Sequence, residues 1–351
     1  AMGIGLCRTE HMFFDEPKLT AFQKMIVSEN TEDRKANLAK ILPYQQKDFY
    51  EIIKAMKGYP VTIRLLDPPL NEFIQAESKD QLKALAEKLE MKPAVLGAKV
   101  AALDEHNPML GHRGCRLAIT YPEIYEMQVE AIARATAQLD KEGVAHEVQI
   151  MIPNVVSYRE VEQIRGQAEE VIANVNKECG TKLKFAIGSM VEFPRTALIA
   201  DKVAQFADFF SFGTNDLSQT TFGFSRDDYG KFIESYLDQR ILEDDPFATL
   251  DPDGPGALME IAEAKGRKVK ANLHLGICGE HGGDPASIAL CYKLGLNYVS
   301  CSPFRVPLAR LAGAQAVIKA GVKKPAAKKP AAKKATTAKK PAATKKAAAK
   351  K

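Results

Sequence analysis

The sequence predicts a (β/α)₈ barrel, and three observations lead to this prediction. Eight strand-like runs alternate with helix-like stretches along residues 1–322, a pattern typical of a parallel sheet. Four runs in the second half end in short groups of polar or reactive residues, as expected where βα loops build a site at the carboxyl ends of barrel strands. The chain has 351 residues, enough for one decorated barrel, which typically takes about 250.

The first half contributes four of the expected strands. They are Gly3–Cys7, Pro60–Leu66, a run within 110–119 around Gly111-His-Arg-Gly-Cys-Arg-Leu117, and His146–Ile152. The helices expected here span 18–29, 31–57, 77–91, Tyr121–Glu142 and Ser157–Cys179. The second strand must stop at Asp67, because the two prolines that follow cannot donate to a β-ladder. The polar helix over 77–91 has the character of an insertion.

The second half contributes the other four strands, each an apolar, β-branched or aromatic run with a reactive end. They are Phe185–Glu192, Phe209–Asp216, Leu273–Cys278 and Tyr298–Ser302. Helices are expected at 194–206, 255–266, 283–294 and 303–319. We therefore expect one α/β barrel domain over residues 1–322.

Residues 323–351 differ in composition from everything before them. They repeat Lys-Lys-Pro-Ala-Ala with variation and contain no large apolar residue, so we expect a disordered tail. Without its twelve lysines, 37 Lys and Arg face 44 Asp and Glu, and residues 1–322 carry a net charge of −7. The tail can bind nucleic acid or another polyanion in a salt-dependent way, or it can be a solubilising extension.

Cysteine spacing and hydropathy argue against several classes of protein. The six cysteines form no CxxC pair or tight Cys/His cluster, which argues against a zinc site and for reduced thiols in a cytoplasmic protein. No apolar stretch approaches the roughly 20 residues needed to span a membrane. No signal peptide is recognisable, so we expect no membrane association.

Two carboxylates end neighbouring strands of the second half. Glu192 ends the fifth expected strand and Asp216 the sixth, so a barrel brings them to one edge. Mg²⁺ commonly takes one or two protein carboxylates and fills its other positions with substrate oxygens and water. Either acid alone could be a helix cap or a rim charge, but two on adjacent strands favour a metal site.

Three arginines lie at or near the ends of the first three expected strands. They are Arg8, Arg64 and Arg113. Arg64 has apolar neighbours on both sides, so its guanidinium is expected to reach a polar interior. A guanidinium matches phosphate or carboxylate geometry. Three separate structural salt bridges are the alternative, but convergence on one barrel face favours a phosphorylated or multiply anionic substrate.

Two glycine-containing turns complete the set of candidate residues. Gly213-Thr214-Asn215 can bring backbone N–H groups and a side-chain amide close to an oxyanion. Cys278 lies between Gly276 and Gly279, where the mouth of a barrel would expose its thiol. Near cations such a thiol can act as a nucleophile or as an acid and base, whereas a packed core thiol is the alternative.

Seven motifs resemble the C-terminal domain of the pyruvate, phosphate dikinases, which are phosphoenolpyruvate (PEP)-utilising enzymes. In chain order they are Gly5–Phe14, Arg64–Phe73, Gly111–Leu117, Val191–Arg195, Phe210–Leu217, Gly276–Pro285 and Val299–Arg305. The related PEP synthase shares this barrel, but the segments Cys7–Met12 and Arg64–Pro69 favour the dikinases. Asn71, Ser189 and Phe193 replace the His, Thr and Ile usual in the family.

This resemblance implies a (β/α)₈ barrel that binds pyruvate or PEP together with Mg²⁺. It implies that Glu192 and Asp216 hold the metal, through which they also take part in substrate binding. Arg8, Arg64 and Arg113 would then hold the transferring phosphoryl group, whose charge spreads over its oxygens.

The remaining candidates also receive roles from the resemblance. Gly213, Thr214 and Asn215 would bind substrate oxygens. Cys278 would protonate the enolate when pyruvate forms and take the proton back in the reverse direction.

The expected function is therefore one half of a phosphotransferase reaction with paired acceptors. Mg²⁺-dependent phosphoryl transfer would join pyruvate enolate to a phosphohistidine on another domain. The phosphohistidine and nucleotide-binding domains of the ATP-dependent cycle are not recognisable in this sequence, so we expect the chain to be incomplete for the full reaction. The resemblance also implies a homodimer. A PEP synthase-type barrel, or a non-catalytic barrel with a nucleic-acid-binding tail, remains the alternative.

Overall fold

A computed structural model describes residues 1–105, 107 and 110–321. The tail predicted over 323–351, and with it the domain boundary at 322, lies outside the described residues. Seven strands form one sheet whose order follows the chain. They are β1 (Ile4–Arg8), β2 (Pro60–Arg64), β3 (Glu147–Ile152), β4 (Ala186–Val191), β5 (Phe209–Phe212), β6 (His274–Ile277) and β7 (Tyr298–Val299). Every neighbouring pair is parallel.

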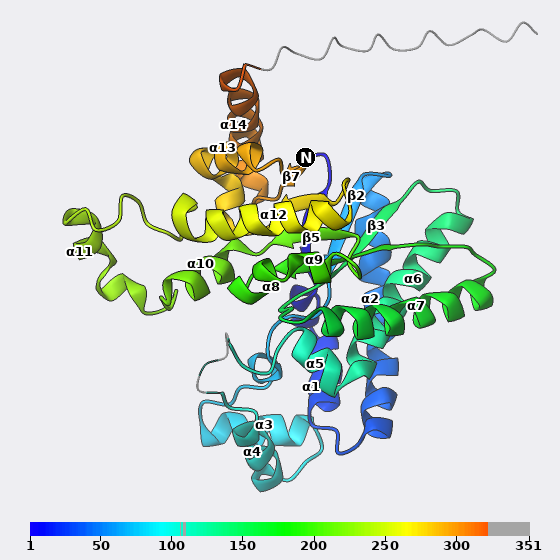
Figure 1. Cartoon of the computed structure of the whole chain (residues 1–351). Coiled ribbons are helices and arrows are strands. Elements are labelled where there is room, and N and C mark those ends of the chain that lie inside the picture. Colours follow the sequence, from blue (N-terminus) through cyan, green and yellow to red (C-terminus); the bar gives the residue numbers. More distant parts are fainter. Residues whose placement is uncertain (106, 108–109, 322–351) are drawn as a thin grey trace, which may run out of the picture.

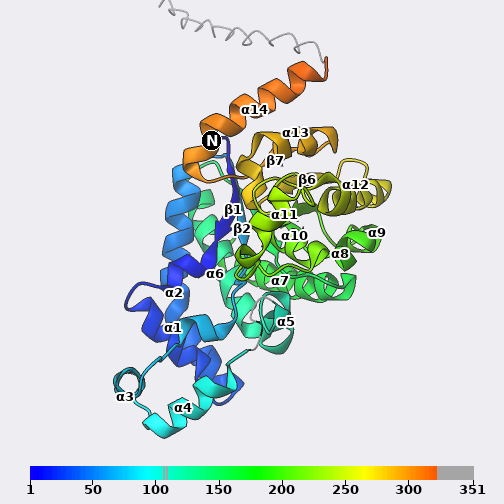
Figure 2. The same cartoon turned by 90° about the vertical axis from the view of Figure 1, so that its left-hand side faces the viewer.

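The sheet curves into a nearly closed barrel, which confirms the predicted fold class. Its two edge strands meet through side chains, because a Cβ on Gly5 of β1 would lie 2.7 Å from Cβ of Ser300 and 2.8 Å from the ring of Tyr298 in β7. Helices surround the sheet (Figures 1 and 2).

The strand predicted within 110–119 is wrong, and the described residues hold seven strands instead of eight. Cys115–Thr120 is a helix, α5, and the segment before it is irregular. Gly114 has φ +56°, a left-handed conformation that interrupts extended backbone. β2 pairs directly with β3, so no place is left between them. A short apolar run is ambiguous between a strand and a buried helix.

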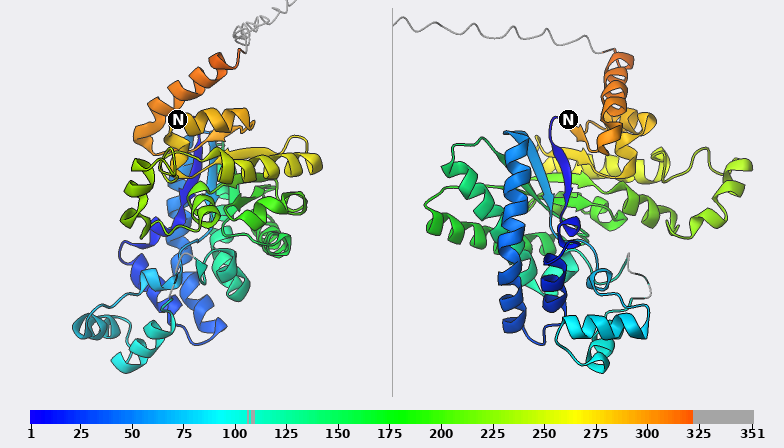
Figure 3. Two further views of the ribbon diagram at one scale, coloured as in Figure 1. Left: turned by 60° about the vertical axis from the view of Figure 1, so that its left-hand side comes forward. Right: turned by 180° about the vertical axis from the view of Figure 1, so that it is seen from behind.

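Most of the remaining helices match the sequence expectations. The remaining helices are α1 (Lys18–Ile26), α2 (Thr31–Met56), α3 (Lys79–Lys88), α4 (Pro93–Ala102), α6 (Pro122–Lys141), α7 (Tyr158–Cys179), α8 (Pro194–Leu198), α9 (Ala200–Val203), α10 (Thr214–Phe222), α11 (Ile233–Asp238), α12 (Ala257–Val269), α13 (Pro285–Lys293) and α14 (Val306–Lys319). Those at Pro93–Ala102, Thr214–Phe222 and Ile233–Asp238 were not expected, and the second of them begins within the run Phe209–Asp216 that was predicted as a strand. The long helix α2 packs against α6, and α6 packs against α7 (Figure 3). Within the part of the chain that the structure describes, no helix is long and apolar enough to cross a membrane.

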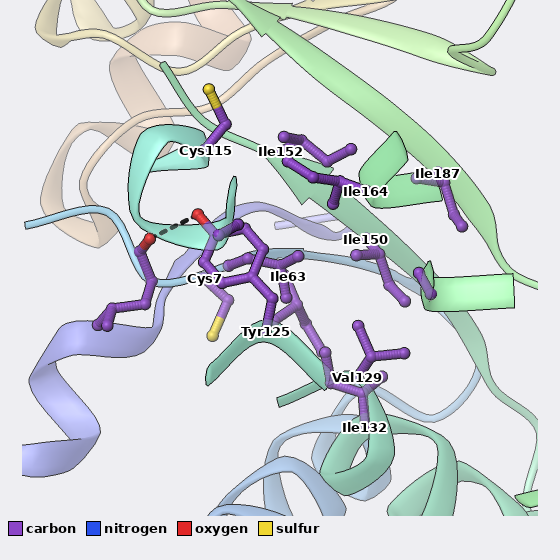
Figure 4. Close-up of a cluster of buried hydrophobic side chains, with 14 of the residues drawn as sticks. Cys7, Ile63, Cys115, Tyr125, Val129, Ile132, Ile150, Ile152, Ile164 and Ile187 are labelled. Atoms are coloured by element: carbon purple, nitrogen blue, oxygen red, sulfur yellow. Dashed lines mark hydrogen bonds between the residues drawn. The ribbon is translucent and has the colours of Figure 1, made fainter. Parts of the chain in front are cut away.

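Side chains on the two faces of the strands form two separate apolar layers. The outer layer lies between strands and helices and includes Ile63, Ile150 and Ile187 (Figure 4). In this layer the Tyr125 hydroxyl donates to the carbonyl oxygen of Leu66, 2.7 Å away. Because successive side chains of a strand point to opposite faces of the sheet, the residues adjacent to these in sequence point into the barrel.

The inner layer fills the barrel with large side chains set against glycines. A Cβ on Gly188 would lie 2.5 Å from the Phe209 ring, and one on Gly276 would lie 2.0 Å from the Tyr298 ring. Both glycines are therefore required by close approach of an aromatic ring. This packing makes the barrel interior solid, so chemistry is confined to its ends.

Two parts of the molecule extend away from the barrel. Helices α3 and α4 share a small apolar cluster, which includes Ile74, Leu89 and Leu96. They lie at the opposite end of the molecule from α14 (Figures 1 and 2). The prediction of an inserted helix over 77–91 is confirmed, and α4 extends this insertion.

Candidate active site

The candidate residues gather where the strands end. Arg8 and Arg64 are register partners at the ends of β1 and β2. Glu192 directly follows β4, Gly213 directly follows β5, and Cys278 directly follows β6. Parallel strands in one barrel bring their carboxyl ends to the same face, so the predicted convergence is confirmed for these positions.

Arg64 is buried between two carboxylates. Its guanidinium donates to Glu10 Oε1 at 2.5 Å and to Asp67 Oδ2 at 2.7 Å. Burial alone would lower the pKa of Arg64, but Asp67 and Glu10 more than offset it, and the pKa is raised. Its Nε is buried and finds no hydrogen-bond partner in the described part of the chain. Arg64 is therefore a fixed cation with one donor left over.

Arg113 joins the same cluster through Asp67. Its Nη2 lies 2.6 Å from Asp67 Oδ2, the oxygen that also binds Arg64. Burial would raise the pKa of Asp67, but the two guanidiniums lower it below the ordinary value for an aspartate. The arginines thus share one carboxylate instead of forming separate salt bridges.

Arg8 is the most open of the three arginines. Its side chain is 43% exposed, and its Nη1 is 3.9 Å from Glu10 Oε1. A loosely paired guanidinium beside two fixed ones provides a place for a mobile anion.

Glu192 is 1% exposed and has one satisfied oxygen. Its Oε1 accepts a hydrogen bond from the backbone N–H of Asn154 at 2.5 Å. Its Oε2 is buried and unpaired within the described residues. Burial, followed by the charges of Asp216 and Asp67, raises the pKa of Glu192 to about 8. The protein's own cations therefore do not fully compensate the negative charge of this carboxylate.

Asp216 lies in the first turn of α10, and burial raises its pKa as well. Burial makes both carboxylates costly to ionise, and one of them has an unpaired oxygen. A divalent cation fits such a pair, because its charge would offset the free-energy cost of ionising each acid. No group of three or more His, Cys, Asp or Glu in the described residues could hold a metal. An ion that takes one or two protein carboxylates, as Mg²⁺ does, fits this donor set.

Gly213 makes room for Glu192. A Cβ at this position would lie 2.5 Å from Glu192 Oε2 and 2.8 Å from Met190 Cε. The sequence predicted contact with substrate oxygens here, and the structure adds a steric reason for glycine.

Thr214 and Asn215 are bound to the loop after β6. Thr214 Oγ1 lies 2.7 Å from Nδ1 of His281, whose Nε2 lies 3.0 Å from the carbonyl oxygen of Pro246. Since that carbonyl can only accept, Nε2 carries the proton and Nδ1 accepts from the threonine hydroxyl. Burial lowers the pKa of His281. Asn215 Oδ1 accepts from the backbone N–H of Glu280 at 3.0 Å.

The prediction that the mouth of the barrel exposes the Cys278 thiol is wrong, because Cys278 is buried at the end of β6 among Met151, Met190 and Phe209. Its Sγ lies 3.6 Å from the carbonyl oxygen of Phe212. Burial raises its pKa to about 11, an effect that the Ser211 hydroxyl partly offsets. The thiol is therefore protonated at neutral pH, which suits a proton donor better than a resting nucleophile.

Sequence reasoning missed Glu10, Asp67, Asn154 and Ser211. Asp67 had a signal, because it follows Arg64 by three residues at a strand end, but the end of a strand explains an aspartate at this position equally well. Nothing local marks Asn154, and the closest partner of Glu10 is Arg64, which is distant in the chain. A cavity of about 430 Å³ lies at the amino ends of β3 and β4, near His146 and Phe185. It is remote from this chemistry.

Comparison with known proteins gives a consistent result. Residues 1–318 match the family model of the PEP-utilising enzyme, PEP-binding domain. A pyruvate, phosphate dikinase of Clostridium symbiosum is 52% identical over 319 residues, 91% of this chain and 36% of the relative. One of Rhizobium meliloti (strain 1021) is 53% identical, with 91% and 35% covered. One of Giardia intestinalis is 52% identical, with 91% and 36% covered. The chain thus spans about a third of the length of these relatives.

Proposed function

Because this chain belongs to the PEP-utilising enzymes and carries their PEP-binding domain, we propose that it interconverts pyruvate and PEP at the carboxyl ends of its strands. The reaction is the pyruvate half of the pyruvate, phosphate dikinase reaction. It is Mg²⁺-dependent phosphoryl transfer between pyruvate enolate and a phosphohistidine on another domain. The family resemblance that the sequence predicted is confirmed.

One observation supports this proposal most strongly. A cluster of three arginines and a pair of under-compensated carboxylates lie on the same barrel face. PEP carries a phosphoryl group, which needs cations, and a carboxylate next to the enol oxygen, and these oxygens can chelate a metal. The two halves of the site match the two halves of this substrate.

The protein groups then have separate roles. Arg64 and Arg113, held by Asp67, and the more open Arg8 bind the phosphoryl oxygens and compensate their charge during transfer. Glu192 and Asp216 hold the Mg²⁺, which when bound supplies the Lewis acidity that stabilises an enolate. Thr214 and Asn215, anchored by His281 and Glu280, orient the substrate at the start of α10.

Cys278 completes the reaction by moving one proton. When the phosphoryl group leaves PEP for the unphosphorylated histidine of the carrier domain, the S–H proton goes to the methylene carbon of the enolate and gives the methyl group of pyruvate. In the opposite direction the thiolate removes a methyl proton. The raised pKa of the thiol, about 11, places the resting proton on sulfur, ready for pyruvate formation.

Binding of PEP tests the proposal directly. We expect isothermal titration to show PEP binding that requires Mg²⁺ and weakens about tenfold or more in Arg64→Lys, because lysine cannot reproduce the fork held by Glu10 and Asp67. Arg159→Lys, a change to an exposed arginine of α7, should bind PEP like the wild type. Absence of Mg²⁺-dependent binding would contradict the proposal.

We also propose a homodimer located in the cytoplasm. Phe304 is 96% exposed and Leu311 and Ile318 are 57% and 72% exposed on or just before α14, which supports an apolar contact with a second copy. All six cysteines are unpaired, as is usual in a reducing compartment. Light scattering should give a dimer mass for the wild type and a monomer mass for Leu311→Glu.

The tail supports a second, separate candidate function. Its twelve lysines can bind a polyanion, and a chain truncated after Val322 tests this. Salt-sensitive DNA binding that truncation abolishes would establish a tail function without affecting PEP binding.

A further inference from the structure

Asn154 lies between the two halves of the candidate site and contacts both. It follows β3 by two residues and is 1% exposed. Its backbone N–H donates to Glu192 Oε1 at 2.5 Å. Its side-chain Nδ2 donates to Asp67 Oδ1. One residue therefore binds both a candidate metal carboxylate and the carboxylate that holds the arginines.

The backbone conformation of Asn154 makes this double contact possible. Its φ is +59°, the left-handed region that asparagine tolerates better than most residues. The neighbouring chain is fitted to it, because a Cβ on Gly114 would lie 2.6 Å from both Cβ and Nδ2 of Asn154. The Cys115 Sγ also donates to the Asn154 carbonyl oxygen at 3.1 Å. Residues at the N-terminus of α5 thus hold Asn154 in place.

The orientation of the Asn154 amide follows from its surroundings. If the amide were reversed, its oxygen would face the Asp67 carboxylate, and two acceptors would repel. The Asp67 carboxylate is ionised, since its pKa is lowered by Arg64 and Arg113 despite its burial. The hydrogen bond from Nδ2 is therefore assisted by charge and fixes the plane of a carboxylate whose other oxygen binds both arginines.

We propose that Asn154 is a positioning residue that couples the metal half of the site to the arginine half. Its backbone sets Glu192 and its side chain sets Asp67, so one left-handed residue fixes the distance between the bound metal and the phosphoryl-binding guanidiniums. This inference rests on the proposed function and adds a residue that touches neither ligand.

Two substitutions separate the backbone role from the side-chain role. Asn154→Gly keeps a left-handed residue and its N–H but removes the hydrogen bond to Asp67. Asn154→Ala removes the same bond and also disfavours the backbone conformation that directs the N–H at Glu192. Lys57→Gly is the matched control, since Lys57 is exposed, has φ +50° and is remote from the site.

The readouts are Mn²⁺ affinity from the electron paramagnetic resonance signal of free Mn²⁺, with pyruvate present, and PEP affinity from titration calorimetry. We expect Asn154→Gly to keep Mn²⁺ affinity within about twofold and to lose about tenfold or more in PEP affinity, the usual scale for a lost hydrogen bond to a charged group. Asn154→Ala should lose affinity for both ligands, and Lys57→Gly for neither.

Other results would overturn the inference. Wild-type PEP affinity in Asn154→Gly would show that the Asn154 side chain does not position the arginine half, and the proposed coupling of the two halves would be lost. Equal losses of Mn²⁺ and PEP affinity in the Gly and Ala variants would show a general structural role. In both cases wild-type binding would leave the proposed function intact. A wild type that binds neither Mn²⁺ nor PEP would overturn both.

Discussion

The two halves of the candidate site differ in how completely the protein satisfies their charges. On the arginine side, Arg64 and Arg113 share Asp67 at 2.7 and 2.6 Å, and the pKa of that acid is lowered. On the carboxylate side, the pKa of Glu192 is raised to about 8 and its Oε2 has no partner among the described residues. The first half is built before any ligand arrives, whereas the second requires a cation. Substitutions on the two sides should therefore have opposite effects on stability.

The largest effect is expected for Asp67→Ala. Removing the shared carboxylate leaves two buried guanidiniums without their common partner, and loss of one member of a buried ion pair typically costs about 3–5 kcal/mol. We expect denaturant unfolding to show a loss of this size. Glu169→Ala, which removes an exposed partner of Arg165, should cost less than about 1 kcal/mol. If Asp67→Ala and Glu169→Ala lost the same free energy of unfolding, the arginine side of the site would be no better satisfied than an ordinary surface ion pair.

Gly213→Ala tests the crowding around Glu192. The added methyl group would meet Glu192 Oε2 at 2.5 Å, and overpacking of this kind costs about 1–3 kcal/mol. The φ of Gly213 is −84°, so the cost comes from crowding and not from backbone strain. Gly166→Ala in α7, where a Cβ has open space, should be neutral or stabilising in the same thermal unfolding experiment.

Glu192→Gln should have the reverse sign from Asp67→Ala. It replaces an acid that resists ionisation with a neutral amide of the same shape, and without metal we expect unchanged or higher stability, by up to about 1–2 kcal/mol at pH 8. Mg²⁺ should raise the melting temperature of the wild type but not of the variant. A clear destabilisation of the metal-free variant would show that the Glu192 charge is already balanced.

The pH dependence of metal-free stability sharpens the same comparison. The pKa of Glu192 is 4.5 without its surroundings and about 8 in the fold, so between these values the folded state binds more protons than the unfolded state. Its contribution to stability is therefore present below pH 4.5 and lost as the pH rises through about 8. This falling trend should be weaker in Glu192→Gln, in which Asp216, whose pKa is also raised by burial, still contributes to it. Saturating Mg²⁺ should also weaken it in the wild type.

The sequence was sufficient for the barrel and for the positions of the reactive residues. Strand periodicity and the polar strand ends placed Glu192, Asp216 and Cys278 on one face, because strand ends in a barrel converge whatever the detailed packing. It failed for Cys115–Thr120, where a short apolar run cannot distinguish strand from helix. It also missed Glu10 and Asn154, since their roles arise from contacts 54 and 38 residues away. Charge balance within the site depends on such contacts.

Exchange of the methyl protons of pyruvate in D₂O, followed by NMR, tests the account most directly. It requires the metal half of the site and Cys278 but no phosphohistidine domain. We predict exchange that depends on Mg²⁺, rises with pH as more of the thiol, with its pKa of about 11, becomes thiolate, and disappears in Cys278→Ala. Cys291→Ala, which removes a buried thiol outside the site, should exchange like the wild type. Exchange that persists in Cys278→Ala, or that is absent from the wild type with Mg²⁺, would contradict the account.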